Sequence, residues 1–194
     1  ANVEQAAAEF GCQALSSVEE LAGRVDAAIV AVPTTAHAGA GCALMESGID
    51  VLVEKPIAPD MASAQRLIDT AAARGRILQV GHLERFNPAI TALDGLIKLP
   101  LFFEVHRMSI FTPRSLDVDV VLDLMIHDLD IVLSLVKQAP SEIRAAGISI
   151  LSRKVDIANV RLAFPTGCIA NLTASRVSTE RVRKLRVFQP REYI

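Results

Sequence analysis

The run Ala27-Ala28-Ile29-Val30-Ala31-Val32 decides the fold class of this chain. It is apolar without alternation and Pro33 ends it, which is typical of a strand covered on both faces in a parallel sheet. Two further apolar runs, Val51-Leu52-Val53 and Ile77-Leu78-Gln79-Val80, follow it. Helix-forming segments separate the runs, and strands that alternate with helices predict right-handed crossovers and a parallel α/β sheet.

Besides a short helix that the capping-box pattern Ser17-Val18-Glu19-Glu20 predicts, three longer segments of the first half carry helix signals. We expect helices over residues 2–10, 36–47 and 60–74. The third segment has Asp60 at the position of an N-cap and Gly75 at the position of a helix stop.

The second half has a different pattern. We expect a helix over 88–98, a strand over 101–110 and a long helix over 118–136. Four strand-like segments then follow in succession: 143–151, 157–164, 168–175 and 182–189. Consecutive strands without helices predict a largely antiparallel sheet. The change of pattern near 82–87 therefore predicts two domains, 1–84 and 85–194.

Composition and charge exclude several classes of protein. Of the 194 residues, 51% are apolar and 22% are charged, as in a globular protein. The formal net charge of −2 provides no basic footprint for nucleic acid. No uncharged apolar run reaches the roughly 20 residues that cross a bilayer, so we expect no membrane span. Cys12, Cys42 and Cys168 have no metal-ligand spacing and fit reduced thiols in a cytoplasmic protein.

The tripeptide Glu54-Lys55-Pro56 places charge directly after a buried strand. Removing a charge from water is costly unless the charge is paired or used. Ligands of open α/β sheets bind outside the carboxyl ends of the strands, so Lys55 can donate a hydrogen bond to a cofactor ribose or a substrate hydroxyl. An ordinary polar residue that leaves a strand is the alternative.

Asp123 and His127 are four residues apart, so they share one face of the predicted long helix. Asp130 continues this polar strip, and the opposite face is apolar. A histidine flanked by carboxylates is a candidate general base for a hydroxyl group. A helix with a hydrated polar face is the alternative, and no further His or Cys has the spacing of a zinc site.

The segments after the first and third strands hold further candidates. Pro33, Thr34 and His37 lead into a helix, whose N-terminus favours polar ligand groups, so they are candidate cofactor contacts. A surface residue at a helix start explains His37 equally well. His82 and Arg85 can face the same crevice, or they can pair with other residues of their loop.

A basic cluster lies on or beside the last predicted strand: Arg176, Arg181, Arg183, Lys184 and Arg186. Pairs of arginines suit a diphosphate. A hydrated face of the sheet is the alternative.

In their order along the chain, these features resemble the glucose–fructose oxidoreductase/inositol dehydrogenase (Gfo/Idh/MocA) family of NAD(P)-dependent sugar dehydrogenases. The matching motifs are Pro33-Thr34 with His37, Glu54-Lys55-Pro56, and Asp123-x-x-x-His127. The resemblance covers essentially the whole chain. It implies an incomplete Rossmann domain over 1–84 and a partial substrate and oligomerisation domain over 85–194, with a homo-oligomer formed through the C-terminal sheet.

Residues 80–88 and 123–131 are most similar to the nucleotide-sugar branch of this family. That branch oxidises the 3-hydroxyl of UDP-N-acetylglucosamine or a related UDP-sugar, often for lipid A or surface polysaccharide. The resemblance implies that the catalytic residues are Lys55, Asp123 and His127. It implies that NAD or NADP is bound by Pro33, Thr34, His37, Glu54, Lys55 and His82. It implies that the sugar is bound by Lys55, Arg85, Asp123, His127 and Arg183.

The start of the chain and the choice of substrate leave alternatives. The glycine-rich loop of the family does not open the chain, so we expect roughly 30 or more residues before Ala1. The alternatives are an inositol or unactivated-sugar dehydrogenase of the same family, or a non-catalytic Rossmann-like regulatory or binding subunit. Lys55, Asp123 and His127 argue against the last alternative, because a regulator needs none of them.

Overall fold

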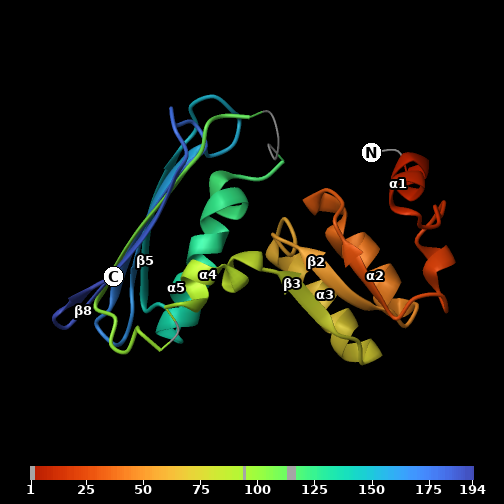
Figure 1. Ribbon diagram of the computed structural model, residues 1–194, viewed down its shortest axis with the longest axis horizontal. Coiled ribbons are helices and arrows are strands. Elements are labelled where there is room, and N and C mark those ends of the chain that lie inside the picture. Colours follow the sequence, from red (N-terminus) through yellow and green to blue (C-terminus); the bar gives the residue numbers. More distant parts are fainter. Residues whose placement is uncertain (1–2, 94, 113–116) are drawn as a thin grey trace. The chain divides into compact units, whose positions relative to one another are not determined.

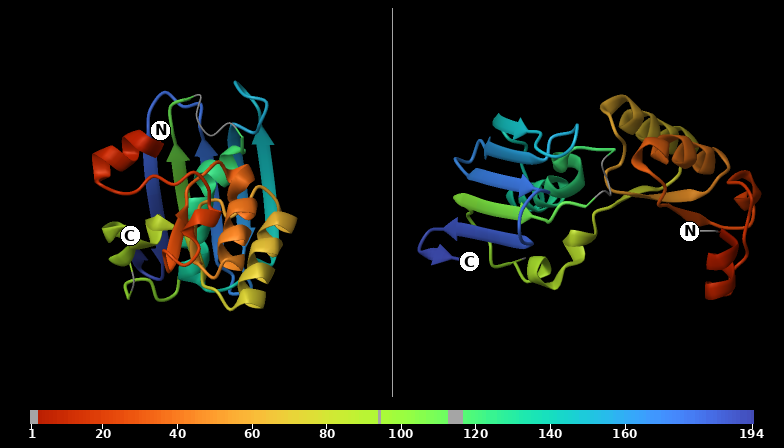
Figure 2. Two further views of the ribbon diagram at one scale, coloured as in Figure 1. Left: turned by 90° about the vertical axis from the view of Figure 1, so that its right-hand side faces the viewer. Right: turned by 90° about the horizontal axis from the view of Figure 1, so that it is seen from above.

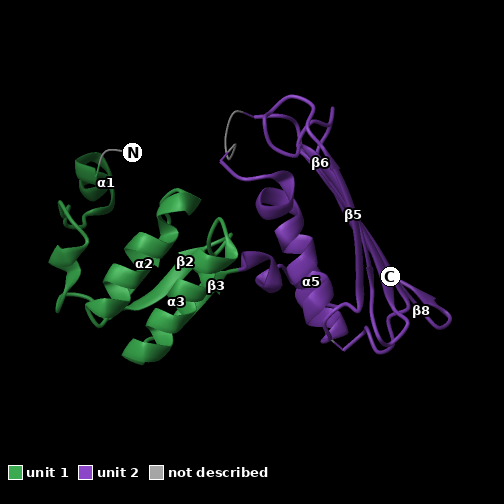
Figure 3. Ribbon diagram, turned by 180° about the vertical axis from the view of Figure 1, so that it is seen from behind, with its two compact units in different colours: residues 1–81 green, residues 82–194 purple. Residues whose placement is uncertain are grey.

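The computed structural model describes residues 3–93, 95–112 and 117–194. It consists of two compact units, Ala1–Gly81 and His82–Ile194, which Figure 3 colours separately. The division falls after Gly81, slightly before the boundary expected after residue 84. Within the described residues, no helix has both the length and the apolar character needed to cross a membrane.

Unit 1 contains a parallel sheet with the strand order β1-β2-β3 (Figure 1). Its strands are β1 (Ala27–Val30), β2 (Asp50–Glu54) and β3 (Leu78–Gly81). Its helices are α1 (Val3–Phe10), α2 (His37–Glu46) and α3 (Met61–Arg74), with short turns η1 (Glu19–Leu21) and η2 (Thr34–Ala36). The parallel α/β prediction for this half is confirmed.

The helices α2 and α3 pack together and against one face of this sheet. Val51 and Val53 point into a core with Met45 of α2 and Leu67 of α3, all nearly inaccessible to solvent. The two helices approach closely at Gly41, where an added Cβ would lie 2.6 Å from Leu67 Cδ2. The expectation of strands covered on both faces is only half met in the described residues, because Ile29 is 69% exposed.

Unit 2 contains a six-stranded sheet with the order β5-β6-β7-β4-β8-β9. Its strands are β4 (Phe102–Met108), β5 (Glu142–Ile148), β6 (Ile157–Ala163), β7 (Ile169–Ser175), β8 (Val182–Gln189) and β9 (Glu192–Tyr193). The central pair β4 and β7 is parallel and the other pairs are antiparallel, which confirms a largely antiparallel sheet. Figure 2 (right) shows β4 in green between its blue neighbours.

The remaining elements of unit 2 are η3 (Leu83–Phe86), α4 (Pro88–Thr91), the π-helical turn η4 (Val121–Met125) and α5 (Ile126–Val136). Both η4 and α5 pack on one face of the sheet (Figure 1). Phe103 and Val105 of β4 meet Met125 and Val132 in this core, and all four are buried. Alternate residues of β4 therefore point to the opposite face, where the described residues place no helix.

Two helix predictions for this half need correction. The helix expected over 88–98 ends at Thr91, because Gly95 turns the chain with a φ of +83° and the Gln189 side chain binds the main chain of residues 96–99. The helix expected over 118–136 begins as a π-turn, in which the Asp119 carboxylate accepts hydrogen bonds from the Val121 and Leu122 N–H groups.

Candidate active site

Lys55 directly follows β2 at the carboxyl edge of the parallel sheet, as the sequence predicts. Its side chain is half-buried. The main-chain N–H of Lys55 donates to Glu54 Oε2 at 3.3 Å. The Glu54 carboxylate packs against the end of β3, where a Cβ on Gly81 would lie 3.2 Å from Glu54 Oε2. Gly81 therefore gives the Glu54 carboxylate the room to fold over the strand ends beside Lys55.

His37 is fully buried at the start of α2, so it is not a surface residue. Its Nδ1 lies 2.9 Å from the Pro56 carbonyl oxygen, and its Nε2 lies 2.9 Å from the Val32 carbonyl oxygen. Both ring nitrogens are therefore engaged by the main chain. The ring connects the loops that follow β1 and β2, and the cofactor contact expected of His37 stays a prediction.

Thr34 and Pro33 differ in exposure although they are neighbours. Thr34 is buried in the first turn of η2, whereas Pro33 is exposed between β1 and η2. Both lie at the carboxyl edge of the sheet, where a dinucleotide would be bound.

In unit 2, Asp123 lies in the π-turn η4 and His127 lies in the first turn of α5. Both side chains are half-buried. π-Turns are rare and frequently occur at functional sites. The sequence pattern identified the pair but not the π geometry that presents it.

Arg85 and His82 lie near a third residue of the same polar strip, Asp130. The Nε and Nη2 atoms of Arg85 donate to the two Asp130 carboxylate oxygens at 2.7 and 2.5 Å. His82 Nδ1 lies 3.9 Å from Asp130 Oδ2. The segment that follows β3 is therefore bound to α5 by an ion pair. Arg85 pairs with a residue of this helix and not with a residue of its own loop.

A cavity of about 280 Å³ lies within unit 2, between α4, α5, β4 and β8. Its lining includes the charged residues Glu84, Arg107, Asp128 and Arg183 and the apolar residues Ile90, Leu93, Ile131 and Leu185. Glu84 Oε1 lies 3.5 Å from Arg107 Nη1 and 3.3 Å from Arg183 Nη1, so Glu84 connects a buried arginine with an exposed one.

The two carboxyl groups that line this cavity have pKa values shifted in opposite directions. Burial raises the pKa of Asp128, and the hydrogen bonds from Arg107 oppose it without reversing it. Burial also favours a higher pKa for Glu84. However, a hydrogen bond from Asn87 and the positive fields of Arg107, Arg183 and His127 outweigh it and lower that pKa. Glu84 therefore lies within electrostatic reach of the His127 ring.

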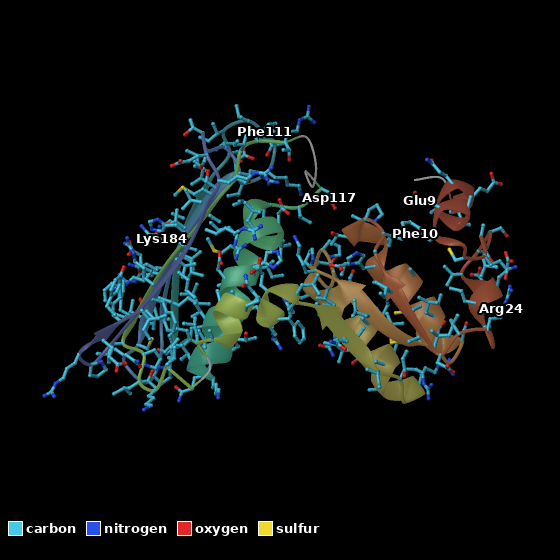
Figure 4. All side chains as sticks on the ribbon, in the orientation of Figure 1. Glu9, Phe10, Arg24, Phe111, Asp117 and Lys184 are labelled. Atoms are coloured by element: carbon cyan, nitrogen blue, oxygen red, sulfur yellow. The ribbon has the colours of Figure 1, made fainter. Side chains whose placement is uncertain are left out.

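The basic cluster on the last strand divides between different surroundings. Arg176 is buried and binds Asp156 and the carbonyl oxygens of Val118 and Val155, so it does not suit a diphosphate. Arg186 pairs with Glu104 on the face of the sheet that α5 leaves open, and Lys184, labelled in Figure 4, belongs to the same face. Of the cluster, Arg183 and its neighbour Lys184 line the cavity.

Arg107, Glu84 and Asp128 were not predicted from the sequence. A signal for Arg107 was present, because it shares strand parity with the buried Phe103 and Val105 and so places a charge on the core face of β4. The pairing of Arg107 with Asp128 depends on the packing of α5 on the sheet, which a single sequence does not reveal.

Two family models match the chain. The model of the oxidoreductase family with an NAD-binding Rossmann fold (GFO_IDH_MocA) matches residues 1–82, and the GFO/IDH/MocA C-terminal domain matches residues 101–190. The chain belongs to the Gfo/Idh/MocA family. The Rossmann assignment of the first half agrees with this membership.

Named members of the Gfo/Idh/MocA family are similar to the chain. UDP-N-acetylglucosamine 3-dehydrogenase from Acidithiobacillus ferrooxidans is 40% identical over 196 residues, which cover 99% of this chain and 63% of the relative. A solved structure of that enzyme matches with a TM-score of 0.90 over 96% of this chain and 64% of its own. Inositol 2-dehydrogenase 4 from Saccharopolyspora erythraea is 34% identical over 66% of this chain and 40% of the relative. The chain thus spans less than two thirds of the length of these relatives.

Proposed function

We propose that the full-length protein oxidises the 3-hydroxyl of a UDP-N-acetylglucosamine-type nucleotide sugar, with NAD or NADP as the acceptor. The observation that carries this proposal is the 40% identity to a UDP-N-acetylglucosamine 3-dehydrogenase over 99% of the chain. The inositol dehydrogenases match only about two thirds of the chain, at lower identity.

The residues at the carboxyl edge of unit 1 fit a nicotinamide dinucleotide. The buried Thr34 hydroxyl and the Lys55 ammonium provide hydrogen-bond donors at the sheet edge where such cofactors bind. When bound, the nicotinamide ring would accept the hydride that leaves the sugar carbon. The chain itself contributes binding, orientation and the transfer of the hydroxyl proton.

His127 is proposed as the general base that takes the proton of the sugar hydroxyl while the C–H bond gives up its hydride. Asp123 is proposed to orient the His127 ring and to stabilise its positive charge after protonation. Lys55 is proposed to donate a hydrogen bond to the reacting oxygen or to the cofactor ribose. The alcohol thereby becomes a ketone, with one proton and one hydride removed.

Arg183 is the proposed partner of the substrate diphosphate. Its side chain is 73% exposed and its contact with Glu84 is 3.3 Å, so an anion can attract it away at little cost. Arg85 is a weaker candidate, because two of its nitrogens already bind Asp130.

Oxidation of inositol is the second candidate function. It is favoured by several inositol 2-dehydrogenases that are 29–34% identical to about two thirds of the chain. Free inositol has no diphosphate, so it gives no role to Arg183.

The cellular setting is also part of the proposal. We place the protein in the cytoplasm, in the formation of a precursor of lipid A or surface polysaccharide.

We propose a homo-oligomer formed through the open face of the unit 2 sheet. An aromatic group at one end of that face, Phe102, Phe188 and Tyr193, supports this contact, with ring centroids 5.8 and 5.0 Å apart in successive pairs.

An assay of the full-length protein tests the proposed reaction. UDP-N-acetylglucosamine should cause formation of reduced cofactor, and mass spectrometry should find a product that has lost two hydrogen atoms from the sugar. Reduced cofactor without such a nucleotide-sugar product would contradict the proposal.

A further inference from the structure

We propose that Arg107 is a positioning residue for His127. This role rests on the proposed function, in which His127 is the general base, and extends it. Arg107 belongs to β4, on the sheet, where its guanidinium contacts the carboxylates of Asp128 and Glu84. Its partner is Asp128, the residue that follows His127 in α5.

The Arg107–Asp128 contact is a buried, forked ion pair. Arg107 Nε lies 3.0 and 2.9 Å from the two Asp128 oxygens, and Nη2 lies 2.7 Å from Oδ1. Arg107 is 7% exposed and Asp128 5%. A forked arginine–carboxylate pair fixes direction as well as distance, so it holds α5 to one place on β4.

Stability alone is a poor reason for such a pair. The cost of removing both charges from water often exceeds their attraction, and apolar residues of similar volume are frequently as stabilising or more so. A buried pair does, however, favour one arrangement of its elements over others. At Arg107 the arrangement that is fixed is the rotation of α5 against the sheet.

A second ion pair, between Arg85 and Asp130, acts on the same helix. An α-helix turns about 100° per residue, so the Asp128 and Asp130 side chains leave α5 about 160° apart. Arg107 holds the first and Arg85 the second. Two ion pairs on nearly opposite sides of α5 fix the rotation of its first turn, which contains His127. The π-turn η4 lies immediately before this turn, where the helical register changes.

Glu84 adds an electrostatic reason for the same residue. Its carboxylate contacts Arg107 and lies within electrostatic reach of both His127 and Asp128. Without Arg107, two carboxylates would face each other with less compensation, and they would repel. Arg107 therefore holds the Glu84 and Asp128 carboxylates together next to the turn of α5 that contains His127.

The test compares four variants of the full-length protein: Arg107→Met, Arg107→Lys, the double variant Arg107→Met/Asp128→Leu, and the control Arg153→Met in an exposed loop. Thermal unfolding, kcat, the Kd for NAD and the carbon–proton signal of the His127 ring in histidine-labelled protein are measured for each. The double variant removes both buried charges together, so we expect it to fold even if Arg107→Met does not.

We expect the double variant to unfold at about the wild-type temperature, to bind NAD as the wild type does, and to lose roughly 10- to 100-fold in kcat, the size of effect expected from a small misplacement. The His127 ring signal should shift in it. Arg107→Lys should recover only part of kcat, because it keeps the charge and loses the fork. Arg153→Met should match the wild type.

Wild-type kcat together with an unshifted His127 signal in the double variant would overturn the positioning role and leave Arg107 a purely structural residue. If the wild-type protein oxidises no sugar, the proposed function fails on its own. The His127 signal still decides the positioning role in that case, with a shift supporting it and an unchanged signal overturning it.

Discussion

The ring of His37 lies 2.9 Å from the carbonyl oxygen of Pro56, the residue that follows Lys55. The other ring nitrogen contacts the Val32 carbonyl at the same distance. One buried imidazole thus connects the segments that follow β1 and β2. Lys55 lies in the second of these segments, at the carboxyl edge of the sheet. The order of this edge depends on His37, whichever ligand is bound there.

Replacing His37 should therefore destabilise unit 1. In His37→Ala one main-chain carbonyl loses its N–H donor and a cavity remains, so the free energy of unfolding should fall by about 2–4 kcal/mol. Urea denaturation measures this change. The control is His106→Ala on the open face of the unit 2 sheet, where the side chain is 35% exposed and the loss should stay below about 0.5 kcal/mol. Equal losses in both variants would contradict the structural role of His37.

The buried Asp156 carboxylate should give unit 2 an acid-sensitive contribution to stability. Asp156 is inaccessible to solvent and accepts three main-chain N–H groups of residues 150–152 as well as the Arg176 guanidinium. Burial acts to raise its pKa, but the hydrogen bonds outweigh it and hold the pKa well below its usual range. The charged form is therefore the one that the fold favours.

Because the folded-state pKa is lowered, this stabilisation is fully present above the unfolded-state pKa of about 3.9 and decreases as the pH falls below it. Asp156→Asn should cost about 3–5 kcal/mol at pH 7, since it leaves Arg176 buried without its carboxylate. The difference from wild type in urea denaturation should shrink when the pH is lowered toward 3. A difference that is constant with pH would show that the carboxylate charge is not responsible.

Reversing the charge at Arg183 should weaken substrate binding. In Arg183→Glu the proposed diphosphate contact becomes repulsive, so KM for the UDP-sugar should rise by roughly 10-fold or more while the Kd for NAD is unchanged. The nearby exposed Arg181 provides the control, because Arg181→Glu makes the same charge change away from the cavity. A parallel rise of KM in both variants would indicate a general field effect instead of a diphosphate contact.

Removing the proposed catalytic groups should lower turnover much more than cofactor binding. For His127→Ala and Lys55→Ala in the full-length protein, we expect kcat to fall by about 10²- to 10⁴-fold, the usual range for general acid–base groups. The Kd for NAD should change little. Lys154→Ala, in an exposed loop, is the control. Near-normal turnover in His127→Ala would transfer the role of base to another residue.

Local patterns in the sequence were sufficient for most of the fold. Apolar runs predicted β1, β2 and β3, and the Asp60 cap and the Gly75 stop predicted the limits of α3. These features depend on neighbours in the chain, which a sequence displays. The helix expected after Pro88 was wrong beyond Thr91, because its end depends on Gln189, a residue about 90 positions later.

The same distinction applies to the candidate site. Lys55, Asp123 and His127 were visible as charges in apolar surroundings. The burial of His37 and the pairing of Arg107 with Asp128 were not visible, because each depends on contacts between separate elements. Arg176 illustrates the converse error, since its place in a basic cluster suggested a ligand contact while its partners are Asp156 and main-chain carbonyls.

A comparison of three substrates tests the proposed reaction. The full-length protein is assayed with UDP-N-acetylglucosamine, myo-inositol and glucose at equal concentrations and saturating NAD, and kcat/KM is compared. We expect the UDP-sugar to be oxidised with a kcat/KM at least 100-fold above that of inositol or glucose, because the diphosphate adds a charge-assisted contact that the free polyols lack. Efficient oxidation of inositol or glucose, with none of the UDP-sugar, would contradict the account and leave only the membership of the Gfo/Idh/MocA family.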